Sequence, residues 1–311
     1  MMELKVADKR ELADGIWLFE LVDPAGADLP AFEAGGHVPV ETPSGAMRHY
    51  SLSNDPAERH RYQIAVKLEP ESRGGSRSMV ENVATGDLLK VDAPGNDFPL
   101  GEAPDYLLIA GGIGITPILA MARHLTAGDK SFRLVYCTRS AEQTAFLDVL
   151  NSGELAGEII IHHDGGDPDR LFDFWDLLEN PSKTHVYCCG PKALMEEVRG
   201  MTGHWPESAV HFEDFQPVEK VRAEDRAFTV TLARSGRTIE IPADRTILET
   251  LRDNGIEVPS SCESGTCGTC KTGLLDGSPD HRDMVLMDEE KEDQIMICVS
   301  RSAGGDLVLD I

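Results

Sequence analysis

Basic residues are scarce in this 311-residue sequence, where 29 Lys and Arg stand against 54 Asp and Glu and the formal net charge is −25. A protein that binds the phosphate backbone of nucleic acids needs a basic face, and docking on anionic lipid also needs basic residues. The composition therefore argues against nucleic-acid and membrane partners. An acidic surface keeps a protein in solution, and it can also steer a basic partner protein.

Long hydrophobic runs are also lacking. The first 15 residues, MMELKVADKRELADG, contain no uninterrupted apolar core of the kind found in a signal peptide. The most apolar run, residues 106–122, is interrupted by three glycines and Pro117, and it is slightly too short to span a bilayer easily. It fits a strand, a tight turn and a buried helix. We therefore expect a cytoplasmic protein whose seven cysteines stay reduced instead of forming a disulfide framework.

Internal repeats and low-complexity tracts are absent, but three regions differ in pattern. Residues 1–101 consist of short alternating segments between glycine and proline turns, such as YQIAVK at 62–67, which predicts an antiparallel β-barrel. In residues 102–217, apolar strand-like runs alternate with helical stretches, which predicts an α/β domain with a parallel sheet. These runs are 106–110, 133–137, 158–161 and 185–189.

The third region begins after residues 218–226, which are charged and unpatterned and therefore predict a linker. Within residues 227–311, AFTVTLARSGRTIEIP predicts a β-hairpin with its turn at Ser235 and Gly236. DRTILETLRDNG predicts a helix that begins at Asp244 or Thr246 and ends before Gly255. The chain is therefore expected to contain three domains of different fold class.

Four cysteines in this third region have the spacing of a metal centre. They are Cys262, Cys267 and Cys270, followed after 27 intervening residues by Cys298. Zinc sites are usually built from two short ligand pairs, whereas here a lone cysteine stands on each side of one pair. A plant-type [2Fe–2S] cluster uses C-x4-C-x2-C and a distant fourth cysteine. The spacing therefore predicts a [2Fe–2S] cluster in preference to zinc or a redox-active C-x-x-C pair.

The hairpin, helix and cysteine loop together resemble a plant-type ferredoxin, over residues 227–311. The resemblance implies a β-grasp fold. It also implies a one-electron carrier whose cluster lies near the surface, where a partner can reach it.

A second motif, RHYSLSN at 48–54, resembles the flavin-binding strand of ferredoxin–NAD(P) reductases. A guanidinium such as that of Arg48 can pair with a phosphate through two hydrogen bonds. The ring of Tyr50 can lie on the isoalloxazine, and the Ser51 hydroxyl can bond to the reactive flavin nitrogen. Lys67, which ends the segment 62–67, is a further candidate cofactor contact. In the same family an aromatic residue near the position of Phe215 covers the flavin face.

The stretch SRGGS at 72–76 opens a predicted helix. The free N–H groups of Gly74, Gly75 and Ser76 would form a cradle for the flavin phosphate. The alternative is a plain turn with a capping serine.

Two motifs in the central region point to a nicotinamide nucleotide. GGIGITP at 111–117 lies between a strand and a helix, and its Gly112, Gly114 and Thr116 can present N–H groups to a pyrophosphate. It is not the Rossmann fingerprint, since Pro117 replaces the third glycine, and a tight structural turn is the alternative. YCCGP at 187–191 resembles the CGP motif of ferredoxin–NAD(P) reductases, in which the cysteine stands beside the reacting nicotinamide carbon. That residue is Cys189 here, followed by Gly190 and Pro191.

In their order along the chain, which is the flavin strand, the two nucleotide motifs and then the cysteine loop, the four motifs resemble the phthalate dioxygenase reductase family over essentially the whole chain. The resemblance implies FMN, NADH and a [2Fe–2S] cluster in a monomer that passes electrons to a Rieske-type terminal oxygenase. Hydride would move from NADH to FMN between Ser51 and Cys189, and single electrons would then leave through the cluster. Arg139, at the end of the strand LVYCTR, could instead bind the extra phosphate of NADPH. Two further interpretations stay open, a stand-alone diaphorase and a non-enzymatic redox sensor.

Overall fold

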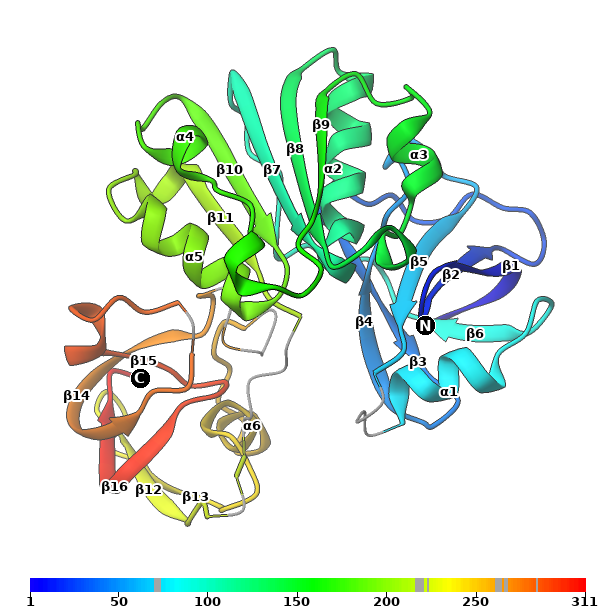
Figure 1. Cartoon of the computed structure of the whole chain (residues 1–311). Helices are drawn as coiled ribbons and strands as arrows, with labels where there is room; N and C mark the ends of the chain where they lie inside the picture. Colours follow the sequence, from blue (N-terminus) through cyan, green and yellow to red (C-terminus); the bar gives the residue numbers. More distant parts are fainter. Residues whose placement is uncertain (70–73, 216–220, 223, 261–264, 266–267, 284) are drawn as a thin grey trace. The chain divides into compact units, whose positions relative to one another are not determined.

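The computed structural model describes residues 1–69, 74–215, 221–222, 224–260, 265, 268–283 and 285–311 (Figure 1). The chain divides into two compact units, Met1–Glu213 and Asp214–Ile311. Within the described residues, no helix is both long enough and apolar enough to cross a membrane.

The first sheet is antiparallel and has the order β4-β3-β6-β1-β2-β5. Its strands are β1 (Met2–Ala13), β2 (Ile16–Val22), β3 (His37–Glu41), β4 (Met47–Ser51), β5 (Tyr62–Lys67) and β6 (Leu88–Val91). The two end strands approach each other at a bridge between Leu52 and Ile64, so the sheet curls on itself. The helix α1 (Gly75–Asn82) contributes Met79 to the core inside this sheet. The predicted fold class of this region, an antiparallel β-barrel, is confirmed.

The second sheet is parallel throughout and has the order β11-β10-β7-β8-β9. Its strands are β7 (Asp105–Gly111), β8 (Ser131–Thr138), β9 (Glu158–His163), β10 (Thr184–Cys189) and β11 (Val210–Glu213). Its helices are α2 (Ile115–Ala127), α3 (Leu147–Asn151), α4 (Trp175–Leu178) and α5 (Lys192–Thr202). Short 3-10 turns are η1 (Gly112–Gly114), η2 (Ala141–Gln143), η3 (Pro168–Arg170) and η4 (Glu207–Ala209). All four predicted strands are present.

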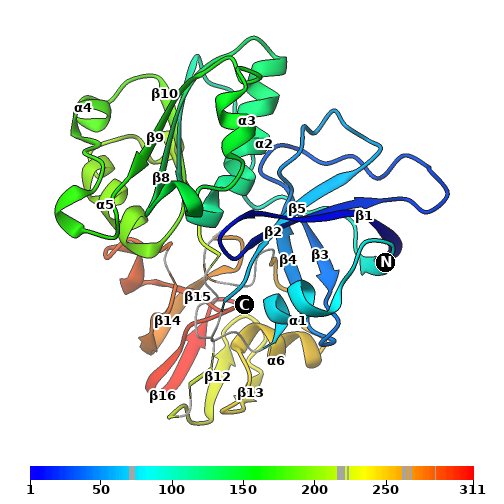
Figure 2. The same ribbon diagram turned by 45° about the vertical axis from the view of Figure 1, so that its right-hand side comes forward.

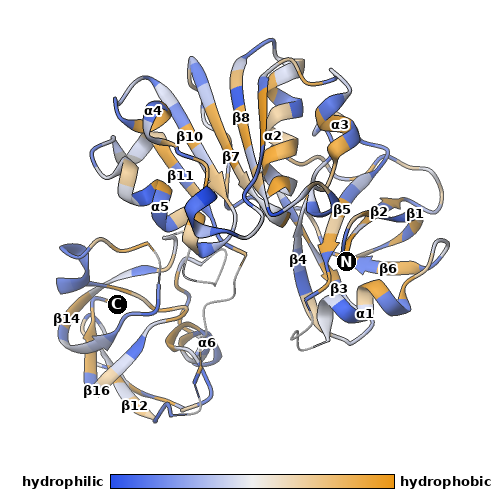
Figure 3. Cartoon of the chain, viewed as in Figure 1, coloured by the Kyte–Doolittle hydropathy of each residue, from blue (hydrophilic) through white to orange (hydrophobic). Residues whose placement is uncertain are grey.

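The two faces of the parallel sheet belong to different cores. Leu108 and Leu134 pack in one core with residues of α2, and that core also contains Ile16 and Leu18 of the antiparallel sheet. The residues that alternate with them along the strands pack against α4 and α5 in a second core. Figures 1 and 2 show α2 on one side of the sheet and α4 and α5 on the other. Figure 3 shows the hydrophobic residues of the strands and of α2 in orange. The shared core makes Met1–Glu213 one compact unit.

The second unit contains a mixed sheet of order β13-β12-β16-β14-β15, in which β12 and β16 are parallel. Its strands are β12 (Phe228–Leu232), β13 (Thr238–Ile241), β14 (Lys271–Asp280), β15 (Gln294–Met296) and β16 (Arg301–Leu309), with the 3-10 turn η5 (Glu290–Glu292). The helix α6 (Ile247–Asp253) packs its apolar face against this sheet. Thr246, not Asp244, caps α6, in a capping box with Glu249. This is the predicted β-grasp arrangement.

Candidate functional site

The crevice predicted to bind a nucleotide lies where the order of the parallel sheet reverses. The chain runs from β7 outward to β8 and β9, then returns to the other side of β7 with β10. In open parallel sheets, ligands bind beyond the carboxyl ends of the strands at this point. The two predicted nucleotide motifs follow β7 and β10, so the topology brings them to the same edge.

Glycines allow the two motifs to touch. A β-carbon on Gly190 would lie 2.9 Å from the Cα of Gly111, and one on Gly114 would lie 2.1 Å from the carbonyl oxygen of Cys189. Gly112 has a φ of 52°, in the left-handed region that glycine adopts readily. The motifs therefore meet as bare backbone, which leaves room for a ligand to approach their N–H groups.

The other predicted nucleotide residues take different positions around this crevice. The Thr116 hydroxyl donates to the carbonyl oxygen of Ile113 at 3.1 Å, so it closes the turn from within. Pro191 is exposed and immediately precedes α5. Arg139 is exposed just after β8, and its Cδ would lie 3.8 Å from a β-carbon on Gly166, in the loop after β9. Arg139 therefore reaches the same edge of the sheet from the side of β9.

The three cysteines of the parallel sheet face two different ways. Cys189 is fully buried in the core that the parallel sheet shares with the antiparallel sheet. Cys188 points to the opposite face, under α5. Burial raises the pKa of the Cys188 thiol, and burial followed by the charge of Asp164 raises the pKa of Cys137 to about 12. Cys137 and Cys188 are thus unreactive packed thiols, and Cys189 is the one that faces the predicted flavin sheet.

The predicted flavin strand, β4, pairs in register with β3, with Ser51 opposite His37. Because side chains alternate along a strand, Arg48 and Tyr50 lie on one face and Ser51 on the other. Burial raises the pKa of the Tyr50 phenol to about 12, although the nearby Arg48 charge opposes this. Among the described strands, β4 forms a ladder only with β3, so a cofactor along its open edge can contact side chains of both faces.

The predicted phosphate cradle is formed by Arg48 and the start of α1. Gly74 has a φ of 97° and directly precedes α1. A β-carbon on Gly75 would lie 3.0 Å from the Nε of Arg48, so the guanidinium stem crosses the first turn of the helix. At the other end of α1, the Lys9 ammonium donates to the carbonyl oxygens of Val80 and Val83 at 2.5 and 2.7 Å. A guanidinium and the N–H groups at the start of a helix together suit a phosphate dianion.

Three further residues, Ser76, Lys67 and Phe215, were predicted to contact the flavin. The Ser76 hydroxyl accepts a hydrogen bond from the Glu69 N–H at 3.2 Å. The Lys67 ammonium forms an ion pair with Glu69 at 2.7 Å, and a flavin contact would have to compete with this pair. Phe215 belongs to the second unit, and its side chain is 41% exposed.

Two of the four predicted cluster ligands lie in the described part of the chain. Cys270 and Cys298 are both buried in the core of the second unit. Lys271 pairs with Met296 between β14 and β15, which places the two cysteines at the same end of this strand pair. A β-carbon on Gly265 would lie 2.8 Å from a methyl carbon of Val299, so Gly265 packs closely against the residue next to Cys298. Cys262 and Cys267 lie outside the described residues.

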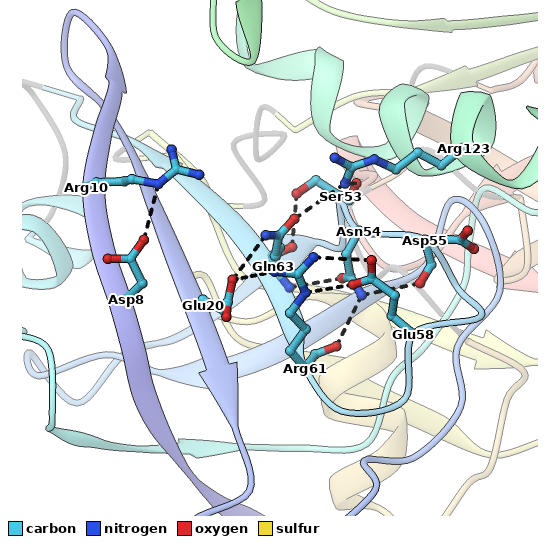
Figure 4. A network of polar contacts seen from close by, with 10 residues as sticks. All are labelled: Asp8, Arg10, Glu20, Ser53, Asn54, Asp55, Glu58, Arg61, Gln63 and Arg123. Atoms are coloured by element: carbon cyan, nitrogen blue, oxygen red, sulfur yellow. Dashed lines mark hydrogen bonds and ion pairs between the residues drawn. The ribbon is translucent and has the colours of Figure 1, made fainter. Parts of the chain in front are cut away.

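The sequence patterns did not single out one charged residue that contacts the segment directly after the flavin strand. Arg123, on α2, donates to the carbonyl oxygen of Ser53 at 2.8 Å (Figure 4). A single arginine inside the apolar stretch ILAMARHL was the only sign of it in the sequence.

The chain is similar to known proteins along its full length. A family model described as a 2Fe-2S iron-sulfur cluster binding domain matches residues 230–303. The phthalate dioxygenase reductase of Burkholderia cepacia is 55% identical, over 100% of this chain and 97% of its own length. The phthalate 4,5-dioxygenase oxygenase reductase subunit of Pseudomonas putida is 56% identical, over 99% of this chain and 96% of its own length. A solved structure, "Phthalate dioxygenase reductase: a modular structure for electron transfer from pyridine nucleotides to [2Fe-2S]", matches with a TM-score of 0.75 and 55% identity, over 100% of this chain and 98% of that one.

Proposed function

Because the chain belongs to the phthalate dioxygenase reductase family, we propose that it passes electrons from NADH, through FMN and a [2Fe–2S] cluster, to the oxygenase component of an oxygenase system. The observation that carries the proposal is the contact between Gly114 and Cys189. It lies at the switch point of the parallel sheet, and Cys189 there faces the core shared with the antiparallel sheet. A nicotinamide bound in this crevice is directed toward the flavin side of the unit.

Nicotinamide gives up two electrons at once as hydride, whereas a [2Fe–2S] cluster accepts one electron at a time. A flavin is therefore needed between them, because FMN when bound supplies both kinds of transfer. The residues of the chain hold and orient the reactants. Arg48 and the N–H groups of Gly74, Gly75 and Ser76 bind the phosphate. The Tyr50 ring supports the isoalloxazine, and the Ser51 hydroxyl donates to its reactive nitrogen.

The nucleotide is held by backbone more than by side chains. Gly112, Gly114 and Thr116 offer N–H groups to the pyrophosphate at the start of α2. Gly190 and Pro191 shape the wall beside Cys189, which stands next to the reacting carbon. Arg139 lies toward the adenosine end, and its exposed guanidinium is the specific reason to test NADPH beside NADH.

Cys262, Cys267, Cys270 and Cys298 ligate the cluster, and the acceptor is the Rieske centre of a terminal oxygenase. The protein works as a cytoplasmic monomer. Its domains are residues 1–101 for FMN, 102–217 for the nucleotide and 227–311 for the cluster, with 218–226 as the linker. Lys67 completes the set of flavin contacts within the first unit.

The test is an anaerobic visible spectrum of the purified holoprotein before and after one equivalent of NADH, with NADPH in parallel. We expect flavin bands and [2Fe–2S] shoulders that both fade with NADH, and faster than with NADPH. Adding a Rieske oxygenase should restore the oxidised spectrum, while a protein of equal size without a redox centre should not. A colourless protein that contains zinc, or a coloured one that neither nucleotide reduces, would overturn the proposal.

A further inference from the structure

A polar network joins the flavin strand to the nucleotide-binding helix (Figure 4). Arg123, on the third turn of α2, stands at one end of this network. One terminal nitrogen of its guanidinium donates to the carbonyl oxygen of Ser53 at 2.8 Å and to the side-chain oxygen of Gln63 at 3.4 Å. Ser53 stands two residues after Ser51, the proposed contact of the reactive flavin nitrogen.

The segment that Arg123 holds is fixed on its other side as well. Ser53 and Asn54 are both fully buried. The Ser53 N–H donates to the Gln63 carbonyl at 2.9 Å, and the Gln63 N–H donates to the Asn54 side chain at 2.9 Å. The Asn54 side chain in turn donates to the Arg61 carbonyl at 3.1 Å. The chain just after Ser51 therefore cannot shift without breaking buried hydrogen bonds.

The other end of α2 is fixed at the nucleotide crevice. The helix begins at Ile115, directly after Gly114, which is in contact with the Cys189 carbonyl. From Gly114 to Arg123 the helix rises by about 14 Å, at ~1.5 Å per residue. An α-helix of this length is stiff, so α2 forms a rigid link from Cys189 to Ser53.

Packing alone does not explain an arginine at this position. Burial lowers the pKa of Arg123, while the carboxylates of Glu154 and Glu58 oppose that effect. Its Nε is buried and has no hydrogen-bond partner within the described residues. A partly buried charge with one unsatisfied buried donor is unfavourable, and an apolar side chain would fill the space with less desolvation. The hydrogen bond to Ser53 is the contact that only a donor can make.

We propose that Arg123 is a positioning residue for hydride transfer, which fixes Ser51 on the flavin side at a set distance from Cys189 on the nicotinamide side. The inference rests on the proposed function and adds a residue to it. No contact with the flavin or the nucleotide is assigned to Arg123. It acts through Ser53 and through the helix that carries it.

The experiment compares FMN- and cluster-loaded protein with Arg123→Met, Arg123→Gln and Arg123→Lys. Flavin reduction by saturating NADH is followed in a single turnover. We expect the Met and Gln variants to reduce flavin at least about tenfold more slowly, because misplacement of reactants by about 1 Å can cost as much as 100-fold. The dissociation constant for NADH and the flavin potential should change little. The Lys variant can still donate to Ser53 and should recover most of the rate.

The matched control is Arg10→Met. Arg10 is an exposed arginine that pairs with Asp8 in the same view but does not touch Ser53 (Figure 4). The rate of flavin reduction in the Arg10→Met variant should equal that of the unaltered protein. If either the Met or the Gln variant retains FMN and reduces it at the unaltered rate, the inference is wrong. If the unaltered protein itself is not reduced by NADH, the proposed function fails instead, so the two failures are distinguishable.

Discussion

Gly114 and Cys189 are so close that a β-carbon on the glycine would lie 2.1 Å from the carbonyl oxygen of the cysteine. The backbone of Gly114 is in the ordinary right-handed region, with a φ of −60°. Glycine is therefore required at this position because the two predicted nucleotide motifs leave no space for a side chain, and not because of its backbone conformation.

We expect Gly114→Ala to impair the nicotinamide crevice. The added methyl group must push the start of α2 away from β10, which costs about 1–3 kcal/mol in a tightly packed site. Reduction of the flavin by NADH should slow, while FMN is retained and dithionite still reduces the cluster. The control is Gly200→Ala on α5, where nothing lies within 4 Å of the new β-carbon. It should leave the rate unchanged and stabilise the helix by up to about 1 kcal/mol. Equal rates in both variants would contradict the prediction.

A second prediction concerns the phosphate cradle. Arg48→Gln should raise the dissociation constant of FMN by about 10- to 100-fold, since a hydrogen bond between charged groups contributes roughly 1.5–3 kcal/mol. Arg48→Lys should restore only part of the affinity, because an ammonium cannot form the paired bonds of a guanidinium. The dissociation constants of both variants are measured by the quenching of flavin fluorescence on binding. Arg77→Gln, on the exposed side of the same helix, should bind FMN normally, and a similar loss there would count against a specific role for Arg48.

Local pattern was enough to predict the elements that carry the sites. The four predicted strands of the parallel sheet are nearly continuous apolar runs because both faces of this sheet are buried. The helix α2 and its preceding turn were expected from glycines followed by a proline in the first helical turn. The C-x4-C-x2-C spacing of the first three cysteines, likewise, is a local pattern. Each of these predictions depends on residues close together in the sequence.

Contacts between distant residues could not be predicted in this way. Arg123 meets Ser53 across 70 positions, and Arg282 meets Asp225 across 57. Asp225 lies in the charged stretch predicted as a linker, yet its side chain is only 6% exposed. Periodicity shows which face of an element is apolar, but it does not show which charge from elsewhere in the chain will compensate a buried one. Arg123 was not predicted from the sequence for the same reason.

A third prediction separates cluster ligands from packed cysteines. Cys270→Ser and Cys298→Ser should reduce iron from about two atoms per chain toward zero and remove the [2Fe–2S] absorption. NADH should still reduce the flavin in these variants, but electrons should no longer reach an oxygenase. Cys137→Ser, in the other unit, should retain both iron and electron transfer. Full iron content in the Cys298 variant would remove this residue from the ligand set.

The last prediction concerns the buried ion pair between Asp225 and Arg282. Hydrogen bonds from Arg282 hold the pKa of Asp225 at about 2, although burial opposes them. A carboxylate whose pKa is lower in the folded state stabilises the fold above the unfolded pKa of about 3.9, and this contribution disappears as the pH falls toward 2. Asp225→Asn should therefore cost about 2 kcal/mol at pH 7, measured by urea unfolding of the second unit through the visible circular dichroism of the cluster. Near pH 3, where unfolding is followed by far-ultraviolet circular dichroism, the loss of stability caused by Asp225→Asn should be about half as large. Asp310→Asn, which breaks an exposed pair with Arg234, should change stability little at either pH. A deficit for Asp225→Asn that does not depend on pH would show that lost packing, not charge, explains its effect.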